Sequence, residues 1–340
     1  MNQNMRYFLG VDSGATKAEF VLGDETRELV RVRTSTIKRM KADAETAQAN
    51  LQSALRQLTA ASGVSMRSIT RCCIGTAGDA VPLVTDWLRE AFARHVGGEL
   101  ILLGDVEIAL DSAFQGGRGV LILAGTGSNV AGRDASGAIV TAGGWGPAIA
   151  DQGSGHFIGL EGLRRGFLAI DRMEPTQLVD AVREYWQIGS LGELIAFANS
   201  SPAPEFSRLA PLVVACAENG DLVAQEVLEQ AGVDLAILAS LVIERISRNQ
   251  APATPRPTTA PAKGGLHKID TLPAVAVAGS ILEHVPSVRK AMEARLRKRY
   301  PNIQILDAPA DPPSGALWNA RHRQPCAAQP ATELQTSSST

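Results

Sequence analysis

The stretch Leu9-Gly10-Val11-Asp12-Ser13-Gly14-Ala15-Thr16-Lys17 decides the fold. It connects an apolar run to a second run that begins at Lys17. Gly14 allows a sharp turn and lets backbone amides approach an anion with no Cβ in the way. Thr16 and Lys17 add a hydroxyl and an ammonium group. The stretch therefore predicts a strand that ends in a phosphate loop, although an ordinary hairpin turn is the simpler interpretation of these residues alone.

Outward from this stretch, apolar patterns predict an α/β domain. Strand patterns with a period of two alternate with helical patterns of apolar residues. The strands are expected at 6–12, 17–23, 28–33, 69–74 and 100–103, and the helices at 43–61, 81–94 and 106–114. Such alternation is typical of a partly parallel sheet.

The opening pattern begins again in the middle of the chain. An apolar run at 120–124 is followed by the turn Gly125-Thr126-Gly127, a second run at 128–132 and an acidic turn at 134–137. The order strand, glycine turn, strand, acidic turn is the order of the N-terminal residues. Internal duplication is therefore predicted, with chance similarity as the alternative.

The remainder of the chain predicts a helical elaboration and a second set of strands and helices. Helical patterns fill 157–247, and the Pro-rich segment 250–263 is expected to be a flexible surface insertion. A strand (274–278), a helix (281–299), a strand (303–306) and a short helix from Ser314 follow. We expect an N-terminal domain at 1–107, a C-terminal domain at 108–320 and a disordered tail at 323–340.

Composition excludes several classes of protein. The chain of 340 residues is 45% hydrophobic and 20% charged, with a formal net charge of −2, so it can bury a large core and has no basic surface for nucleic acid. The N-terminus has no secretory pattern, and the apolar neighbourhoods are too short to span a bilayer. The four cysteines form no C-x-x-C pair. A cytoplasmic protein with reduced thiols, independent of membranes, is expected.

Three further positions have turns or side chains suited to binding phosphate, a flat ring or a metal ion. Gly125-Thr126-Gly127-Ser128 offers a second cradle of amides and hydroxyls, and the Gly279-Ser280 turn lets backbone lie against a flat ring. Asp12, at a strand end, could orient magnesium-bound water. Asp105 follows an apolar strand at the start of a predicted helix, where it can serve as the N-cap.

These loops resemble the two phosphate motifs and the adenosine motif of the acetate kinase/sugar kinase/Hsp70/actin superfamily. Gly144-Trp145-Gly146-Pro147, followed by the stretch 151–159 (DQGSGHFIG), resembles a signature of the BadF/BadG/BcrA/BcrD ATPase-like family, and within it the N-acetylglucosamine and glucosamine kinases. The resemblance covers residues 6 to about 320 except the Pro-rich segment. It implies an α/β fold of two duplicated ribonuclease H-like (actin/hexokinase-type) domains, with a nucleotide cleft between them.

The resemblance also implies ATP and Mg²⁺ as cofactors and assigns roles to residues. Asp105 is implied as the catalytic carboxylate and a sugar contact, and Asp12 as a magnesium ligand through water. Thr126, Gly144 and Asp151 are implied to line the sugar pocket, with helix capping as the alternative for Asp151. The implied ATP-binding residues are Ser13, Gly14, Ala15, Thr16, Lys17, Gly125, Thr126, Gly127, Ser128, Gly279 and Ser280.

Two regions depart from the family pattern. Gln152 stands where a Glu is usual, and His156 stands where an aromatic or small residue is common. The segment 33–40 lacks the Gly/Ala-Asn sequence whose Asn contacts the sugar in the resembling kinases. Lys38 and Arg39 of this segment are either solvated surface charges or groups that receive an anionic or differently substituted sugar.

The expected activity is transfer of the γ-phosphoryl group of Mg-ATP to a hydroxyl, the 6-OH, of an amino sugar such as N-acetylglucosamine or glucosamine. One alternative is an ATPase activator of a CoA-ester dehydratase or reductase, which would need cysteines for an iron–sulfur cluster. The other is a sugar-sensing protein without catalysis. The expected partners are the sugar and ATP, with no nucleic acid and no membrane. A homodimer is compatible with the sequence, which does not fix the oligomeric state.

Overall fold

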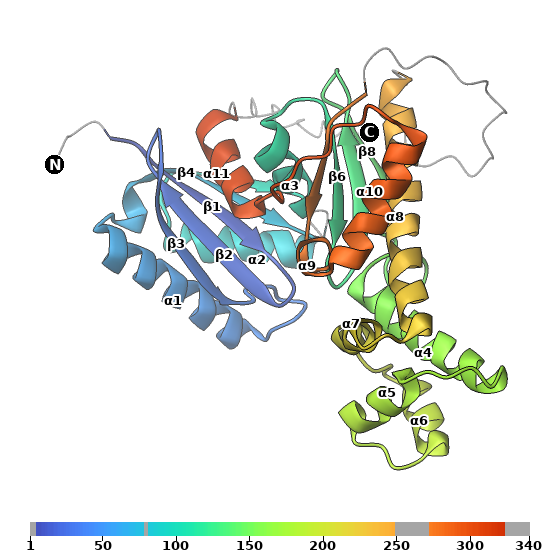
Figure 1. Ribbon diagram of the computed structural model, residues 1–340. Helices are drawn as coiled ribbons and strands as arrows, with labels where there is room; N and C mark the ends of the chain where they lie inside the picture. The colour runs from blue at the N-terminus through green and yellow to red at the C-terminus, as the bar shows by residue number, and fades with distance from the viewer. Residues whose placement is uncertain (1–4, 78–80, 249–271, 324–340) are drawn as a thin grey trace, which may run out of the picture.

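Two β-sheets form the centre of the protein in the computed structural model, which describes residues 5–77, 81–248 and 272–323. The first sheet contains β1 (Tyr7–Ser13), β2 (Lys17–Gly23), β3 (Glu28–Ser35), β4 (Ile69–Thr76) and β5 (Glu99–Leu103), in the order β3-β2-β1-β4-β5. The second contains β6 (Gly119–Ala124), β7 (Ser128–Arg133), β8 (Ile139–Gly143) and β9 (Val275–Ala278), in the order β8-β7-β6-β9. Figure 1 shows the two sheets in separate halves of the molecule.

The two sheets repeat one topology. β1 is antiparallel to β2 and parallel to β4, and β6 is antiparallel to β7 and parallel to β9. The third strands, β3 and β8, each add an antiparallel edge to the hairpin. The predicted internal duplication is therefore confirmed at the level of strand order and direction.

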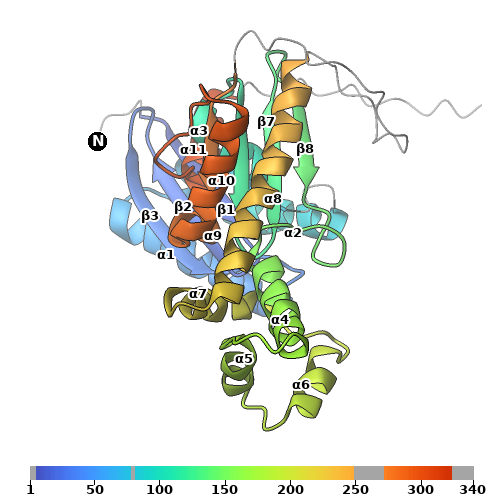
Figure 2. The same cartoon turned by 45° about the vertical axis from the view of Figure 1, so that its right-hand side comes forward.

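Helices cover the outer faces of the sheets. α1 (Ala44–Ser62) and α2 (Pro82–Ala93) bury apolar side chains in one core with β1, β2 and β4. α1 begins where Asp43 accepts a hydrogen bond from Thr46 N, and it ends at Gly63 in a left-handed conformation. α8 (Leu222–Ser247) and α10 (Pro286–Arg299) pack together in the core of the second sheet, as Figure 2 shows.

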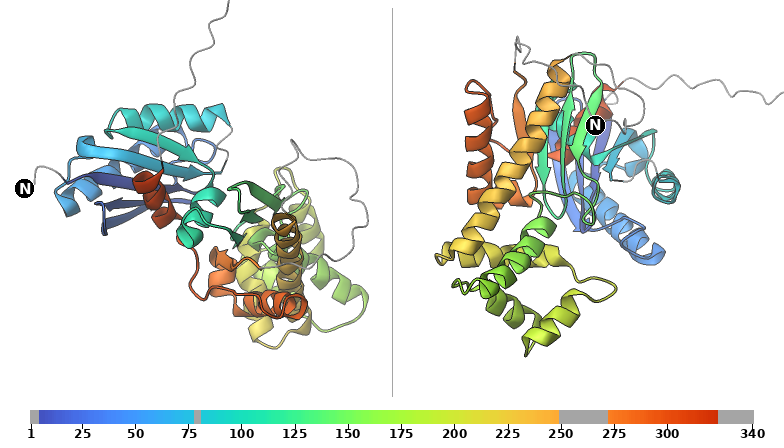
Figure 3. Two further views of the ribbon diagram at one scale, coloured as in Figure 1. Left: turned by 90° about the horizontal axis from the view of Figure 1, so that it is seen from above. Right: turned by 90° about the vertical axis from the view of Figure 1, so that its right-hand side faces the viewer.

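Two helices lie between the sheets, as the view from above shows (Figure 3). α3 (Asp105–Phe114) contributes Ile108 to a core with the first sheet, and Ala109 and Leu110 to a core with the second. α11 (Pro312–His322) packs on β1, where a Cβ on Gly10 would lie 2.3 Å from Leu317 N. The C-terminal helix thus returns to the first sheet, while the predicted division of the chain near residue 107 stays a prediction.

The helical elaboration predicted at 157–247 has two parts, which share one core: α8, which covers the second sheet, and a group of helices below that sheet (Figure 1). The members of this group are α4 (Gly155–Asp171), α5 (Leu178–Trp186), α6 (Leu191–Ala198), the 3-10 helix η2 (Phe206–Leu209) and α7 (Ala210–Glu218). A core that includes Leu163, Val182 and Leu194 joins α4, α5 and α6. None of the described helices is long and apolar enough to cross a membrane.

The structure corrects two predicted elements and adds one strand that was not predicted. The helix predicted at 281–299 is two helices, α9 (Ser280–His284) and α10, because Pro286 cannot continue the hydrogen-bond pattern of α9. The strand predicted at 303–306 is only a single bridge between Ile305 and Val275. β8 was not predicted. The insertion at 250–263 lies outside the described residues, and so does the tail beyond Arg323.

Candidate active site

The first predicted phosphate loop lies between β1 and β2 and is held by a neighbouring segment. Thr36 donates its backbone N–H to Thr16 O at 3.1 Å and its hydroxyl to Gly14 O at 2.8 Å. The Ser13 hydroxyl is buried and has no hydrogen-bond partner among the described residues. Because an unpaired buried hydroxyl is costly, this group fits a site that receives a polar ligand.

Two carboxylates interact beside this loop. Asp12 lies near the end of β1, and Asp105 is the first residue of α3, where Gly104 occupies the N-cap position. Burial raises the pKa of Asp12 to about 7, and repulsion from Asp105 and Glu19 adds to the effect. Asp105 is therefore not the N-cap, and it lies close enough to Asp12 for their charges to interact.

Lys38 belongs to the same group of charges. Its residue is only 8% exposed, so the interpretation of Lys38 as a solvated surface charge is wrong. Asp105 and Asp12 attract its ammonium group, whereas burial lowers the pKa of Lys38. Arg39, by contrast, is half-buried and bonds to the backbone of Ala42.

The second predicted phosphate loop lies between β6 and β7 and is packed by two other turns. Gly155 N donates to Gly125 O at 2.7 Å, and His156 N donates to Thr126 O at 3.1 Å. The Gly279 turn lies on the other side, where an added Cβ would be 2.4 Å from Ala124 O. The structure therefore brings together the Gly125–Ser128 loop, the Gly279-Ser280 turn and the loop before α4.

Asp151 belongs to this second group. A Cβ on Gly127 would lie 2.9 Å from Asp151 Oδ2, so the carboxylate stands directly over the loop. Burial raises the pKa of Asp151, while the backbone amides of Gly146 and Ser128 partly oppose the shift. The helix-cap interpretation of Asp151 is wrong, because Ser154 caps α4 and accepts from Phe157 N at 3.0 Å.

Two further side chains, one on β7 and one next to Asp151 in the chain, were not singled out as ligand groups from the sequence. Asn129 Oδ1 and Gln152 Oε1 are buried without a hydrogen-bond partner among the described residues. Asn129 lies under Gly144, where an added Cβ would be 2.8 Å from its Cγ. No sequence pattern marked Asn129, since its place depends on the pairing of β7 with Gly143.

The described side chains include no cluster of three His, Cys, Asp or Glu that could hold a metal by protein ligands alone. The chemistry of the first group suits a hydrated magnesium ion instead, because Mg²⁺ keeps much of its water and accepts one or two carboxylates. Cys72, Cys73 and Cys216 are buried in apolar cores. Within the described residues, no cysteine lies exposed for an iron–sulfur cluster.

Comparison with known proteins decides the family. Residues 9–318 match the profile of the BadF/BadG/BcrA/BcrD ATPase family, which covers nearly the whole described chain. The chain belongs to this family. The match spans both sheets, both glycine loops and the first part of α11, so the family assignment covers every part of the candidate site.

Curated relatives of this BadF/BadG/BcrA/BcrD member are sugar kinases. An N-acetylmuramic acid/N-acetylglucosamine kinase of Clostridium acetobutylicum is 25% identical over 93% of this chain and 99% of its own. An N-acetyl-D-glucosamine kinase of Dictyostelium discoideum is 27% identical over 91% and 96% of the two chains.

Solved structures confirm the expected fold. A candidate N-acetylglucosamine kinase of Chromobacterium violaceum superposes with a TM-score of 0.68 at 23% identity, over 92% of this chain and 98% of its own. The ROK hexokinase from Thermus thermophilus superposes with a TM-score of 0.54 at 14% identity, over 93% of this chain and 97% of its own. The chain therefore has the duplicated actin/hexokinase-type α/β fold.

Proposed function

We propose that this protein is an ATP-dependent kinase that transfers the γ-phosphoryl group to the 6-OH of an amino sugar such as N-acetylglucosamine or glucosamine. The observation that carries the proposal is the grouping of Asp12, Asp105 and Lys38 beside the first glycine loop. The Gly125–Ser128 loop and the Gly279 turn repeat the same strand-end geometry in the second sheet. The family and its kinase relatives support the same activity.

Backbone amides and small side chains would hold the nucleotide. The loops 13–17 and 125–128 expose N–H groups and hydroxyls to phosphate oxygens, and the buried Ser13 hydroxyl has its hydrogen-bonding capacity free among the described residues. Gly279, with φ +94° and no Cβ, lets its turn pack closely on Ala124 O, and the backbone of this turn would lie against a base or ribose. Catalysis then depends mainly on positioning and charge, as in other phosphoryl transfers.

Asp105 would act on the acceptor hydroxyl. The hydroxyl oxygen forms a bond to the γ-phosphorus while the bond to the β,γ-bridging oxygen breaks, and that electron pair leaves with ADP. The hydroxyl proton passes to the Asp105 carboxylate. Asp151, Thr126 and Gly144 would hold the sugar, with Asp151 as acceptor of hydrogen bonds from its hydroxyl groups.

Magnesium fits the first group through Asp12. A bound Mg²⁺ would neutralise charge on the phosphates, and Asp12 would orient part of its hydration shell. The repulsion between Asp12 and Asp105 supports this placement, since a cation there would relieve it. Because ATP is the donor, we place the reaction in the cytoplasm.

A sugar panel tests the proposal. Wild type should release ADP with glucosamine or N-acetylglucosamine, and the phosphorylated carbon should be C6 by NMR. Asp105→Asn should lower kcat by about 10²–10⁴-fold while ATP binding is retained. Unchanged sugar-dependent ADP release by folded Asp105→Asn would refute the assignment of the base. Absence of turnover by wild type with every sugar would refute the kinase proposal.

A further inference from the structure

A groove along α1 lies apart from the candidate active site, since neither glycine loop contributes to its lining. The groove has a volume of about 470 Å³, which is within the range of small-molecule sites. One wall is formed by Gln52, Arg56 and Thr59, whose spacing places them on one face of α1. Met66, in the segment that follows α1, and His95, which follows α2, also line the groove.

The floor of the groove is apolar. Leu55 and Met66 are buried residues of the core that α1 shares with the first sheet, and both line the groove. An apolar body placed in the groove would cover them and would itself leave water, which is favourable in proportion to the area covered. The floor therefore suits a ligand with an apolar body rather than a free phosphate ion.

The charge around the groove is positive. Arg56 is exposed, and its guanidinium forms no hydrogen bond or ion pair with the described residues. Arg67, which follows a lining residue in the chain, donates to the carbonyls of Ala93 and Arg94 and not to a carboxylate. None of the described residues that line the groove is acidic. An anionic group would therefore meet the unpaired guanidinium of Arg56.

His95 has a further donor for such a group. Gln48 Nε2 lies 2.9 Å from His95 Nε2. Because an amide nitrogen only donates, His95 Nε2 is the acceptor and the ring proton is on Nδ1. No described residue accepts from this Nδ1–H, so it is left for an oxygen of a ligand.

We propose that the groove along α1 binds a small organic anion with an apolar body. Its carboxylate or phosphate group pairs with Arg56, and its body covers Leu55 and Met66. The unpaired guanidinium sets the sign of the ligand's charge, and the floor sets its apolar part. The inference is independent of the proposed kinase function, because no residue assigned to phosphoryl transfer lines the groove.

A chemical-shift titration tests the site, with phenyl phosphate as the probe and protein labelled at the methionine methyl groups. The Met66 signal, assigned by its loss in Met66→Leu, should shift as phenyl phosphate is added. The signal of Met292, which is fully buried in the core of the second sheet, should stay in place. Benzyl alcohol, which lacks the charge, and inorganic phosphate, which lacks the apolar body, should each bind more weakly.

Arg56→Gln should raise the Kd of phenyl phosphate about tenfold, because it removes a charged hydrogen-bond donor. Arg89→Gln is the matched control, since Arg89 is an exposed arginine of α2 that does not line the groove. Its Kd should equal that of wild type. Both arginines are exposed, so neither substitution should unfold the protein.

Three results would overturn the proposal. The first is an unmoved Met66 signal at every concentration of phenyl phosphate. The second is the same Kd in Arg56→Gln as in wild type, which would remove the pairing with the guanidinium. The third is equal binding of benzyl alcohol or of inorganic phosphate, because the former needs no charge and the latter needs no apolar floor.

Discussion

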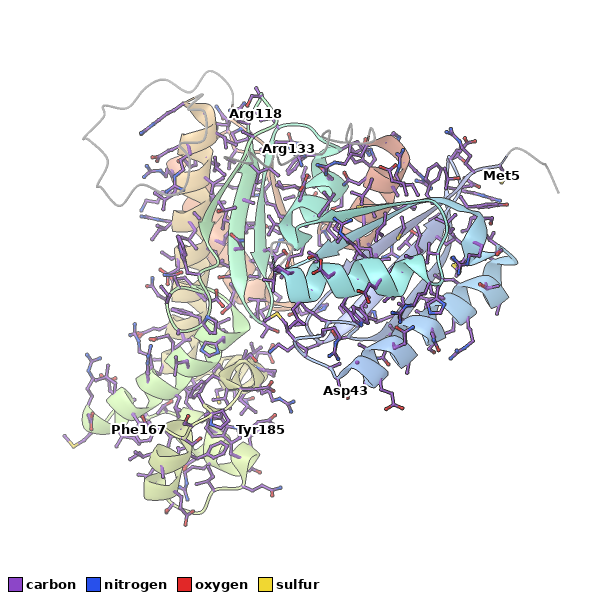
Figure 4. All side chains as sticks on the ribbon, turned by 180° about the vertical axis from the view of Figure 1, so that it is seen from behind. Met5, Asp43, Arg118, Arg133, Phe167 and Tyr185 are labelled. Atoms are coloured by element: carbon purple, nitrogen blue, oxygen red, sulfur yellow. The ribbon has the colours of Figure 1, made fainter. Side chains whose placement is uncertain are left out.

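Replacing Asp111 with alanine should lower the free energy of unfolding by about 3–5 kcal/mol. Asp111 lies in α3 and is only 2% exposed. Its carboxylate bonds to Arg133 of β7, accepts from Gly116 N at 3.2 Å, and accepts from Asn319 Nδ2 of α11 at 2.8 Å. Figure 4 shows Arg133 at the end of the second sheet that lies beside α3. Removal of the carboxylate leaves a buried guanidinium without its counter-charge.

Urea unfolding followed by tryptophan fluorescence measures the change. Glu90→Ala is the control, because Glu90 and Arg94 form an exposed pair at 3.5 Å that should contribute no more than about 0.5 kcal/mol. The double variant Asp111→Leu/Arg133→Met should lose less than Asp111→Ala, since it leaves no buried charge unpaired. A loss below about 1 kcal/mol in Asp111→Ala would refute the reasoning that this contact is a buried ion pair.

Two further predictions concern tight turns, one at Gly279, with Gly137 as the control, and one at Asp24. Gly279→Ala should cost about 2–4 kcal/mol and weaken ATP binding measured by calorimetry, because φ is +94° and the new Cβ would meet Ala124 O at 2.4 Å. Gly137→Ala, with φ +90° and nothing within 4 Å of its Cβ, should cost only about 1–2 kcal/mol of strain, so equal losses would contradict the steric account. Asp24→Ala should cost about 1–2 kcal/mol at pH 7, because Asp24 accepts from Thr26 N at 2.7 Å. Hydrogen bonds from the backbone lower the pKa of Asp24 from 3.8 to about 2. The free energies of unfolding of wild type and Asp24→Ala, measured by urea titration, should therefore converge as the pH falls from 3.8 to about 2. A difference that stays constant over this pH range would refute the prediction.

The sequence predicted the repeated unit because its signals are local. Strand periodicity and the glycine turns at Gly14 and Gly127 depend on neighbouring residues only, and β1, β2, β6 and β7 were all predicted within one or two residues. β8 was missed because it is only five residues long and its place depends on pairing with β7. The strand predicted near Ile305 has the right apolar pattern, but it forms only one bridge.

Some features could not be predicted from the sequence because they depend on contacts between residues that are far apart in the chain. Lys38 and Arg39 are adjacent cations in the sequence, and no local pattern says which one is buried. The distinction depends on contacts of the preceding Thr36 with the loop at Gly14, more than twenty residues away. The return of α11 to the first sheet likewise depends on the close approach allowed by Gly10.

The position of α3 joins the stability of the fold to the proposed chemistry. Asp105 begins this helix, Ile108 packs against the first sheet, and Leu110 packs against the second. A shift of α3 would therefore move Asp105 relative to the glycine loop that follows β1. Asp111→Ala should consequently alter both stability and kcat.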